Sequence, residues 1–190
     1  MQKAAYALIV LASAVSLPAA LVTSIATQPA LADEAELPGP DTQFLAKAII
    51  SGQSEVELSQ VAAQKATQPQ VKQFAERMVK DHQAVNDKLM NEAQRHKIKT
   101  TGTYGTPPLE PSEHAQMTKD QLEALSGDKL DKAYMQHMIQ DHVQAVSLFQ
   151  DEAKNGKDNQ LRDLASSALP TLQDHLKQAR EIGGKVGVQS

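Results

Sequence analysis

The sequence contains no cysteine among its 190 residues. Disulfides and thiolate metal sites are therefore excluded, and the stability of the fold has to come from helix packing or from a bound ion. Basic blocks are missing as well, since 19 Lys and Arg stand against 23 Asp and Glu. This balance argues against a nucleic-acid partner, because proteins bind nucleic acids through clusters of positive charge. Glycine-rich phosphate loops and the Gly-x-Ser-x-Gly motif are also absent, so no enzymatic activity is assigned.

The amino-terminal segment has the pattern of a secretory signal peptide. One cation, Lys3, precedes an uncharged stretch that closes with Ala30-Leu31-Ala32, and acidic residues begin at Asp33. We therefore expect cleavage after Ala32 and a soluble periplasmic chain without a stable membrane span. The alternative is an uncleaved membrane anchor, which Pro18 and the polar residues after it disfavour. Cleavage leaves 18 Lys and Arg against 23 Asp and Glu, a formal charge of −5.

Apolar residues recur at intervals of three and four through the rest of the chain, which predicts an all-α fold. Long helices are expected at residues 41–66, 69–96, 128–154 and 161–182, with a shorter one at 112–125. The segment 97–111 is the longest connection, because it holds two glycines, three prolines and four threonines. Two helical hairpins joined by a long connection are typical of a ferritin-like four-helix bundle. The predicted organisation is a signal peptide at 1–32, a polar lead at 33–40, the bundle at 41–182 and a tail at 183–190.

Local residues set the expected helix ends. Asp41 and Thr42 offer capping oxygens to the first helix, Gly183-Gly184 is expected to end the last one, and Pro170 should bend it.

Short repeated segments suggest an internal duplication, and we call each matching pair an echo. Residues 78–82 resemble residues 138–142, which lie 60 positions later, and residues 70–75 resemble residues 160–165, which lie 90 positions later.

Three histidines and one glutamate interrupt the apolar stripes of the long helices. His82 and His175 occupy stripe positions, His142 lies one turn from Met138, and Glu55 continues the stripe of the first helix. Counting along the helices at about 1.5 Å per residue places Glu55 level with His82 and leaves His175 offset from His142 by about 7 Å. Because side chains lean toward their own helix N-terminus, part of that gap is recovered. Neutral imidazoles and a carboxylate in a water-poor interior suit zinc, copper or iron. We therefore predict a metal site at Glu55, His82, His142 and His175.

Neighbouring residues refine this prediction and leave one alternative open. Each of the three histidines directly follows an aspartate, and these aspartates are available as orienting partners of the site: Asp81, Asp141 and Asp174. Methionines one turn away, Met78 and Met138, would favour copper(I). The alternative is a metal-free polar core in which each histidine is hydrogen-bonded to a carboxylate.

Other sequence features point away from further sites. Di-iron bundles need Glu-x-x-His motifs, and none precedes the three histidines, so ferritin-type iron oxidation is not expected. The remaining histidines lie at helix ends or on polar faces and are expected in solvent: His96, His114 and His137.

A set of motifs spreads over residues 41–182: Phe44-Leu45 with Ala48, Glu55-Val56-Glu57-Leu58, Val71-Lys72-Gln73-Phe74-Ala75, Met78-Val79-Lys80-Asp81-His82, Leu125-Ser126-Gly127, Tyr134-Met135-Gln136-His137-Met138 with Asp141-His142, and Leu169-Pro170-Thr171-Leu172-Gln173-Asp174-His175-Leu176. Together they resemble a family of exported bacterial ferritin-like proteins of unknown function, often labelled outer membrane proteins. The resemblance implies the fold and the export, and it implies no activity. The outer-membrane label conflicts with the residues, whose periodicity is helical throughout. The alternative to a metal-binding function is a structural or stress-related envelope protein, in either case as a possible homo-oligomer.

Overall fold

The computed structural model describes residues 37–98 and 113–188, and every regular element within them is an α-helix. The helices follow one another as α1 (Gly39–Lys65), α2 (Pro69–Arg95), α3 (Glu113–Ala124), α4 (Gly127–Asn155) and α5 (Asn159–Lys185). The prediction of an all-α fold is confirmed for this part of the chain. The predicted signal peptide and most of the predicted connection at 97–111 lie outside the described residues.

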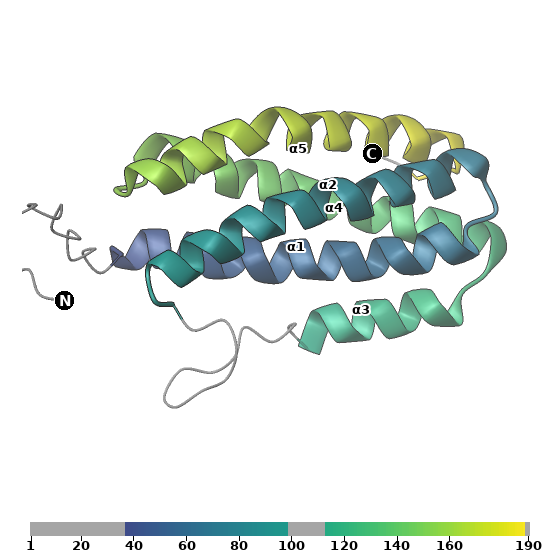
Figure 1. Cartoon of the computed structure of the whole chain (residues 1–190). Helices are drawn as coiled ribbons and strands as arrows, with labels where there is room; N and C mark the ends of the chain where they lie inside the picture. Colours follow the sequence, from purple (N-terminus) through teal and green to yellow (C-terminus); the bar gives the residue numbers. More distant parts are fainter. Residues whose placement is uncertain (1–36, 99–112, 189–190) are drawn as a thin grey trace, which may run out of the picture. The chain divides into compact units, whose positions relative to one another are not determined.

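The four long helices pack as two hairpins (Figure 1). Short turns join α1 to α2 and α4 to α5, and these two pairs have the most extensive helix contacts. Contacts of α1 with α4 and of α2 with α5 join the hairpins to each other. The short α3 packs on the outside, against α1 and α4.

The apolar core consists of two clusters, one toward each end of the long helices. The cluster near the α1–α2 turn, called the first cluster, includes Phe74, Met78, Leu130, Tyr134 and Ala179. The second cluster, at the opposite end, includes Phe44, Ile49, Leu89, Phe149 and Leu161. On each long helix a buried polar residue separates the two clusters: Glu55, His82, His142 and His175. We call these four residues the polar layer.

A buried aspartate of α4 closes the turn between α1 and α2. The Asp131 carboxylate accepts hydrogen bonds from the backbone N–H groups of Thr67, at 3.1 Å, and Gln68, at 2.9 Å. It also accepts one from the Thr67 hydroxyl at 2.7 Å. These bonds satisfy donors at the start of α2 that have no partner inside their own helix.

The equivalent aspartate of α1 closes the turn between α4 and α5. Asp41 is fully buried and accepts hydrogen bonds from the N–H groups of Lys157, at 2.9 Å, and Asp158, at 2.6 Å. The prediction that Asp41 caps its own helix is therefore wrong. α1 begins two residues earlier, at Gly39, and the Asp41 carboxylate serves the start of α5 instead.

The end of α5 also differs from the prediction. The helix continues through Gly183 and Gly184 to Lys185. Gly183 lies where α5 packs closely against α4, and not at the end of its helix. A Cβ atom at Gly183 would lie 2.9 Å from Cδ1 of Ile139 on α4. The stop comes at Gly187, whose φ of 84° lets the N–H of the next residue donate to the Gly183 carbonyl at 2.8 Å.

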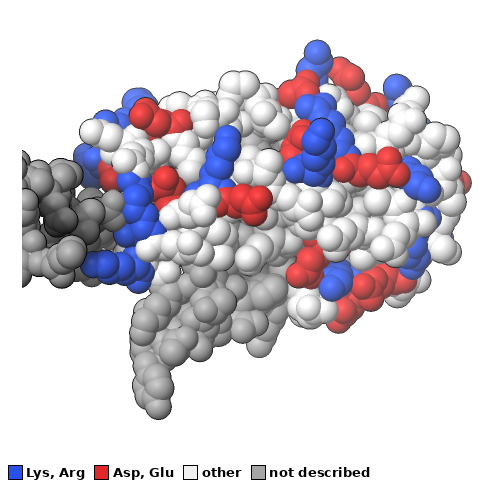
Figure 2. All heavy atoms as spheres, viewed as in Figure 1, with Lys and Arg blue, Asp and Glu red and all other residues white. Residues whose placement is uncertain are grey.

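The surface of the described helices shows mixed charge. Figure 2 shows Lys and Arg side chains interspersed with Asp and Glu across the face in view, rather than gathered in one basic block. Within the described residues no helix combines the length and the apolar character that crossing a bilayer requires.

Replacing Asp131 with alanine should lower the free energy of unfolding by about 2–3 kcal/mol, because the N–H groups of Thr67 and Gln68 and the Thr67 hydroxyl lose a charged acceptor. Asp131→Asn keeps one acceptor oxygen and should cost less. Asp163→Ala, at an exposed position of α5, is the control and should change stability by less than about 0.5 kcal/mol. Urea denaturation followed by circular dichroism measures these differences. An Asp131→Ala protein as stable as the control would show that the turn does not depend on this carboxylate.

Candidate metal centre

The polar layer contains one side chain from each long helix. Glu55 comes from α1, His82 from α2, His142 from α4 and His175 from α5. Apolar residues of the two clusters flank each of them along the same helix face, so packing of that face turns the polar side chains inward. Their residues are at most 5% exposed, and His142 is completely inaccessible. All four predicted site residues thus lie in one buried layer.

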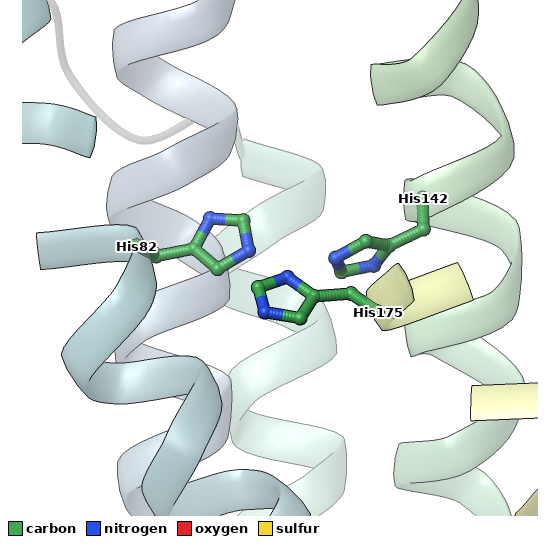
Figure 3. Close-up of side chains that lie close together, drawn as sticks. All are labelled: His82, His142 and His175. Atoms are coloured by element: carbon green, nitrogen blue, oxygen red, sulfur yellow. The ribbon is translucent and has the colours of Figure 1, made fainter. Parts of the chain in front are cut away.

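The three imidazole rings converge on one point (Figure 3). The ring centroids of His82, His142 and His175 are 5.4 Å apart in each of the three pairs. One nitrogen from each ring lies within 4.8 Å of the others, a spacing that no other group of potential ligands has in the described part of the chain. Nitrogens bound to one ion at about 2.0–2.1 Å are about 3.3–3.6 Å apart, so small ring movements would close the triangle.

Glu55 lies beside two of the three rings. Its Oε2 atom is 2.8 Å from His82 Nε2 and 3.7 Å from His142 Nε2. The 2.8 Å contact is short enough for a hydrogen bond but is not aligned as one, so we describe it as an ion pair. Glu55 is not part of the set of ligand atoms within 4.8 Å of one another, which the histidines form alone among the described residues.

Hydrogen bonds fix the tautomers of two histidines. His142 Nδ1 lies 2.8 Å from the Met138 carbonyl oxygen and donates its proton there, because a carbonyl only accepts. His175 Nε2 lies 3.0 Å from Asp81 Oδ2 and donates to that carboxylate. The opposite nitrogens, His142 Nε2 and His175 Nδ1, are buried and have no hydrogen-bond partner in the described structure. Each neutral ring thus directs a lone pair into the interior, as a metal ligand does.

Burial and neighbouring charges divide the layer into one ion pair and two neutral rings. Burial alone would raise the pKa of Glu55, but the charges that His82, His142 and His175 carry in acid outweigh burial and bring that pKa down to about 2. Burial lowers the pKa of His82, yet the Glu55 charge outweighs it and the net shift is upward. Burial lowers the pKa of His142, and it lowers the pKa of His175 to about 4 despite the bond to Asp81. Two rings are therefore neutral at pH 7.

The aspartates next to the histidines were predicted to be available as orienting partners, and Asp81 is one, although for a histidine of another helix. Successive residues on an α-helix point about 100° apart, so Asp81 cannot follow the direction of His82. It bonds His175 on α5 instead. Asp174 pairs with Arg77 on α2, whose Nη1 is 2.9 Å from Asp174 Oδ2. The partners of the layer lie across the α2–α5 contact, which residue spacing along one helix does not reveal.

His96 was predicted in solvent, and this prediction is wrong. Its side chain is 5% exposed, and its Nε2 lies 3.8 Å from Asp158 Oδ2 beside the first turn of α5. The ring is covered because the last turn of α2 ends against the start of α5. His137 is half-buried, and the side chain of His114 lies outside the described part of the structure.

The methionines next to the layer are packing residues of the first cluster. Met78 and Met138 are both fully buried there. Met138 contributes its carbonyl oxygen to His142. A thioether role in copper(I) binding stays a prediction.

Residues 26–182 match the sequence profile of a family described as a domain of unknown function, DUF4142. No curated protein matches the chain in sequence. The family match covers the polar layer and all five helices except the last residues of α5.

Solved structures with a similar fold come from proteins of low sequence identity. A DUF305 fragment from Deinococcus radiodurans has 15% identity and a TM-score of 0.65, covering 78% of this chain and 98% of its own. A DUF305 protein from Streptomyces coelicolor, described as secreted, has 13% identity and a TM-score of 0.66, with 80% and 96% covered. CopM in its Cu(I)-bound form has 16% identity and a TM-score of 0.61, with 76% and 96% covered. These similarities establish a shared helical fold.

The pKa of His175 predicts how acid affects the metal-free protein. Because this pKa is about 4 in the folded protein and 6.5 ordinarily, the unfolded chain binds the proton more tightly. The contribution of His175 to stability is therefore present above pH 6.5 and is lost as the pH falls toward 4. His82, whose pKa is raised, loses its contribution as the pH rises above 6.5, so its effect is in the opposite sense and is present in both proteins compared below.

His175→Gln should remove this acid-dependent loss. Urea denaturation at pH 7 and pH 5, with a chelator present, gives the change in unfolding free energy for each protein. Asp141 and Glu152, whose pKa values burial raises to about 7, titrate in the opposite sense in both proteins, so the difference between the two proteins is the measure. An identical change in the two proteins would contradict the assignment.

Proposed function

The chain belongs to the DUF4142 family, whose function is unknown, and we propose that it binds one transition-metal ion, copper in the first place, within its polar layer. His82, His142 and His175 are the proposed ligands from α2, α4 and α5. Glu55 is the proposed fourth ligand, because its carboxylate already lies against two of these rings.

The observation that carries this proposal is the convergence of three buried nitrogens, two of which have no partner. His142 Nε2 and His175 Nδ1 make no hydrogen bond within the described residues, and His82 Nε2 has the Glu55 carboxylate as its ion-pair partner. Leaving a buried polar atom unpaired costs about 1–3 kcal/mol, so the two unpaired nitrogens need a ligand or an ordered water. Three nitrogens directed at one point, beside a carboxylate, fit a metal ion better than separate waters.

Copper is the preferred ion for two reasons. Imidazole sites of this kind follow the general order of affinity in which copper(II) exceeds iron(II) and zinc. The helical fold is also that of CopM, which was solved in Cu(I)-bound and Cu(II)-bound forms at 16% and 17% identity. This likeness supports copper only in combination with the three histidines of this chain. Zinc and iron remain the alternatives.

A metal-free structural role is the second candidate. The hydrogen bond of His175 to Asp81 and the ion pair of His82 with Glu55 favour it, because they already tie α1, α2 and α5 together. His142 bonds the Met138 carbonyl of its own helix. On this view the protein is a non-catalytic envelope protein whose polar layer fixes the register of the helices.

Further parts of the proposal concern architecture and location. We propose the ferritin-like form of the four-helix bundle for residues 41–182. We also propose export to the periplasm after removal of the signal peptide 1–32. The secreted description of the Streptomyces coelicolor protein supports export. Assembly into a homo-oligomer stays a prediction.

Metal titration tests the function. Metal-free protein should take up one copper(I) per chain in competition with a coloured chelator, and the loaded protein should melt at a higher temperature. His142→Gln combined with His175→Gln should weaken binding by more than about 100-fold. Removing a residue that only hydrogen-bonds a ligand already lowers metal affinity by about 10- to 100-fold, and this variant removes two ligands. His137→Gln, a half-buried histidine of α4 outside the polar layer, is the matched control.

Two results would contradict the proposal. One is the absence of stoichiometric binding when copper, zinc and iron are each supplied. The other is equal affinity in the control and the double variant. A His82→Gln protein that is less stable than the wild type, while neither protein binds an ion, would support the structural role.

Glu55→Gln separates the fourth ligand from the other three. The amide is a poor ligand and cannot neutralise the ion, so we expect one ion still to bind to the histidines with an affinity lowered about 10-fold or more. The same competition titration measures this. Unchanged affinity would show that Glu55 is only the charge partner of His82.

A further inference from the structure

An ion bound in the polar layer has to cross the helix packing, since His142 and His175 are at most 1% exposed. Asp81 connects this interior to the surface. Its side chain is 25% exposed, and its Oδ2 accepts hydrogen bonds from His175 Nε2 at 3.0 Å and from Arg77 Nε at 3.1 Å. One carboxylate oxygen therefore touches both a proposed ligand and a side chain at the surface.

Arg77 spans the two helices above this contact. Its side chain is 36% exposed, and its Nη1 lies 2.9 Å from Asp174 Oδ2 on α5 while its Nε holds Asp81 on α2. The guanidinium thus joins α2 to α5 and keeps two carboxylates occupied. Because a guanidinium is always charged, it also opposes the approach of a cation as long as it stays there.

A surface groove of about 370 Å³ adjoins Arg77 along the α2–α5 contact. Arg77 and Phe74 both line it, and the Phe74 ring packs edge-on against His175 with centroids 6.4 Å apart. Phe74 therefore lines the groove and contacts His175 directly. Arg77 lines the groove and is connected to His175 through Asp81.

Two other hollows in the bundle are less suited as a route for an ion to the polar layer. A cavity lined by Glu55 and His82 measures only about 20 Å³, the size of one water molecule, and its other walls, from all four long helices, are mostly apolar. A Cβ atom at Gly52 would lie 2.1 Å from the Asn86 side chain, which shows how closely α1 and α2 pack.

Between α1, α3 and α4, a hollow of about 270 Å³ is lined by Asp141. Neither this hollow nor the groove at Arg77 is lined by a residue of the polar layer, but Asp81 beside the groove hydrogen-bonds a histidine of the layer, whereas Asp141 has no such bond in the described structure.

We propose that the metal ion enters and leaves between α2 and α5, where Asp81 passes the cation between the groove and His175 and Arg77 acts as a latch over this route. The inference rests on the proposed metal binding. When Arg77 swings away, the carboxylates of Asp81 and Asp174 become available to a cation at the surface. When it returns, it restores the bond that orients His175. Arg77 and Asp81 are positioning residues in this scheme.

The latch predicts a kinetic effect without an equal effect on affinity. Arg77→Gln should accelerate both copper(I) uptake and copper(I) release by about 5- to 10-fold, as expected from losing a part-exposed ion-pair network, and should change Kd by less than about 3-fold. Asp81→Asn should instead weaken Kd by about 10- to 100-fold, because it removes the partner that orients a ligand.

Stopped-flow mixing of the copper(I)-loaded protein with an excess of a coloured copper(I) chelator measures release, at chelator concentrations where the rate has become constant. Mixing metal-free protein with copper(I) measures uptake. Arg77→Lys keeps the charge and should restore part of the slow release. Asp174→Asn cuts the bridge at its α5 end without touching Asp81 and should also accelerate release. Lys80→Gln, at an exposed position of α2, is the control and should match the wild type.

Several outcomes would overturn the latch. Arg77→Gln and Asp174→Asn could both leave the rates unchanged, or they could accelerate release without accelerating uptake, as an ordinary weakening of the site does. Faster exchange in Asp141→Asn with unchanged exchange in Arg77→Gln would place the route between α1 and α4. These failures differ from a failure of the proposed function, because the wild type would still bind one ion per chain.

Discussion

Burial of a carboxylate and three imidazoles between two apolar clusters is the constraint on which the structure depends. Desolvating these groups is costly unless each finds a partner. Glu55 and His82 meet that cost as an ion pair, and His175 and His142 meet part of it through Asp81 and a backbone carbonyl. Each bond except the one to the carbonyl links two helices, so the layer fixes how α1, α2 and α5 face one another. It also leaves ring nitrogens without partners, and these make the interior a candidate site rather than a core alone.

The scaffold around this layer is symmetric, and the layer itself is not. Asp131 follows Asp41 by 90 positions, and the two residues close opposite turns whose backbone donors are also 90 positions apart. This spacing equals the second sequence echo, so α1 corresponds to α4 and α2 to α5. The first echo, at 60 positions, pairs helices that have different places in their hairpins. Residues equivalent to the layer at 90 positions are apolar or small: Gly52, Val85, Ala145 and Leu172. A duplicated hairpin therefore accounts for the turns, and the polar groups belong to each helix separately.

Periodicity predicted the features that depend on one helix at a time. The stripe positions of His82 and His175 indicated burial because a helix face repeats every three or four residues. Features that depend on two helices were missed. Asp81 directly precedes His82 in sequence yet orients His175, and Asp41 lies in the first turn of one helix yet caps another. The Gly183-Gly184 pair indicated a helix end, because glycine is common there. The actual role of Gly183, a close contact with Ile139 of α4, cannot be detected in the local sequence. A single sequence records the periodicity of each helix and not the pairing between helices.

The charge of the polar layer bears on which oxidation state it would accept. Glu55 is ionised and favours the cationic form of His82, so the metal-free layer is close to neutral, with His142 and His175 uncharged. A copper(I) ion that displaced the His82 proton would exchange one positive charge for another. A zinc or copper(II) ion would leave one further positive charge in a dry interior, which carboxylates outside the layer, such as the part-exposed Asp81, would have to compensate. Uncompensated charge is costly where water is excluded, so the single buried carboxylate of the layer favours a monovalent ion such as copper(I). The imidazole ligands by themselves do not favour a monovalent over a divalent ion.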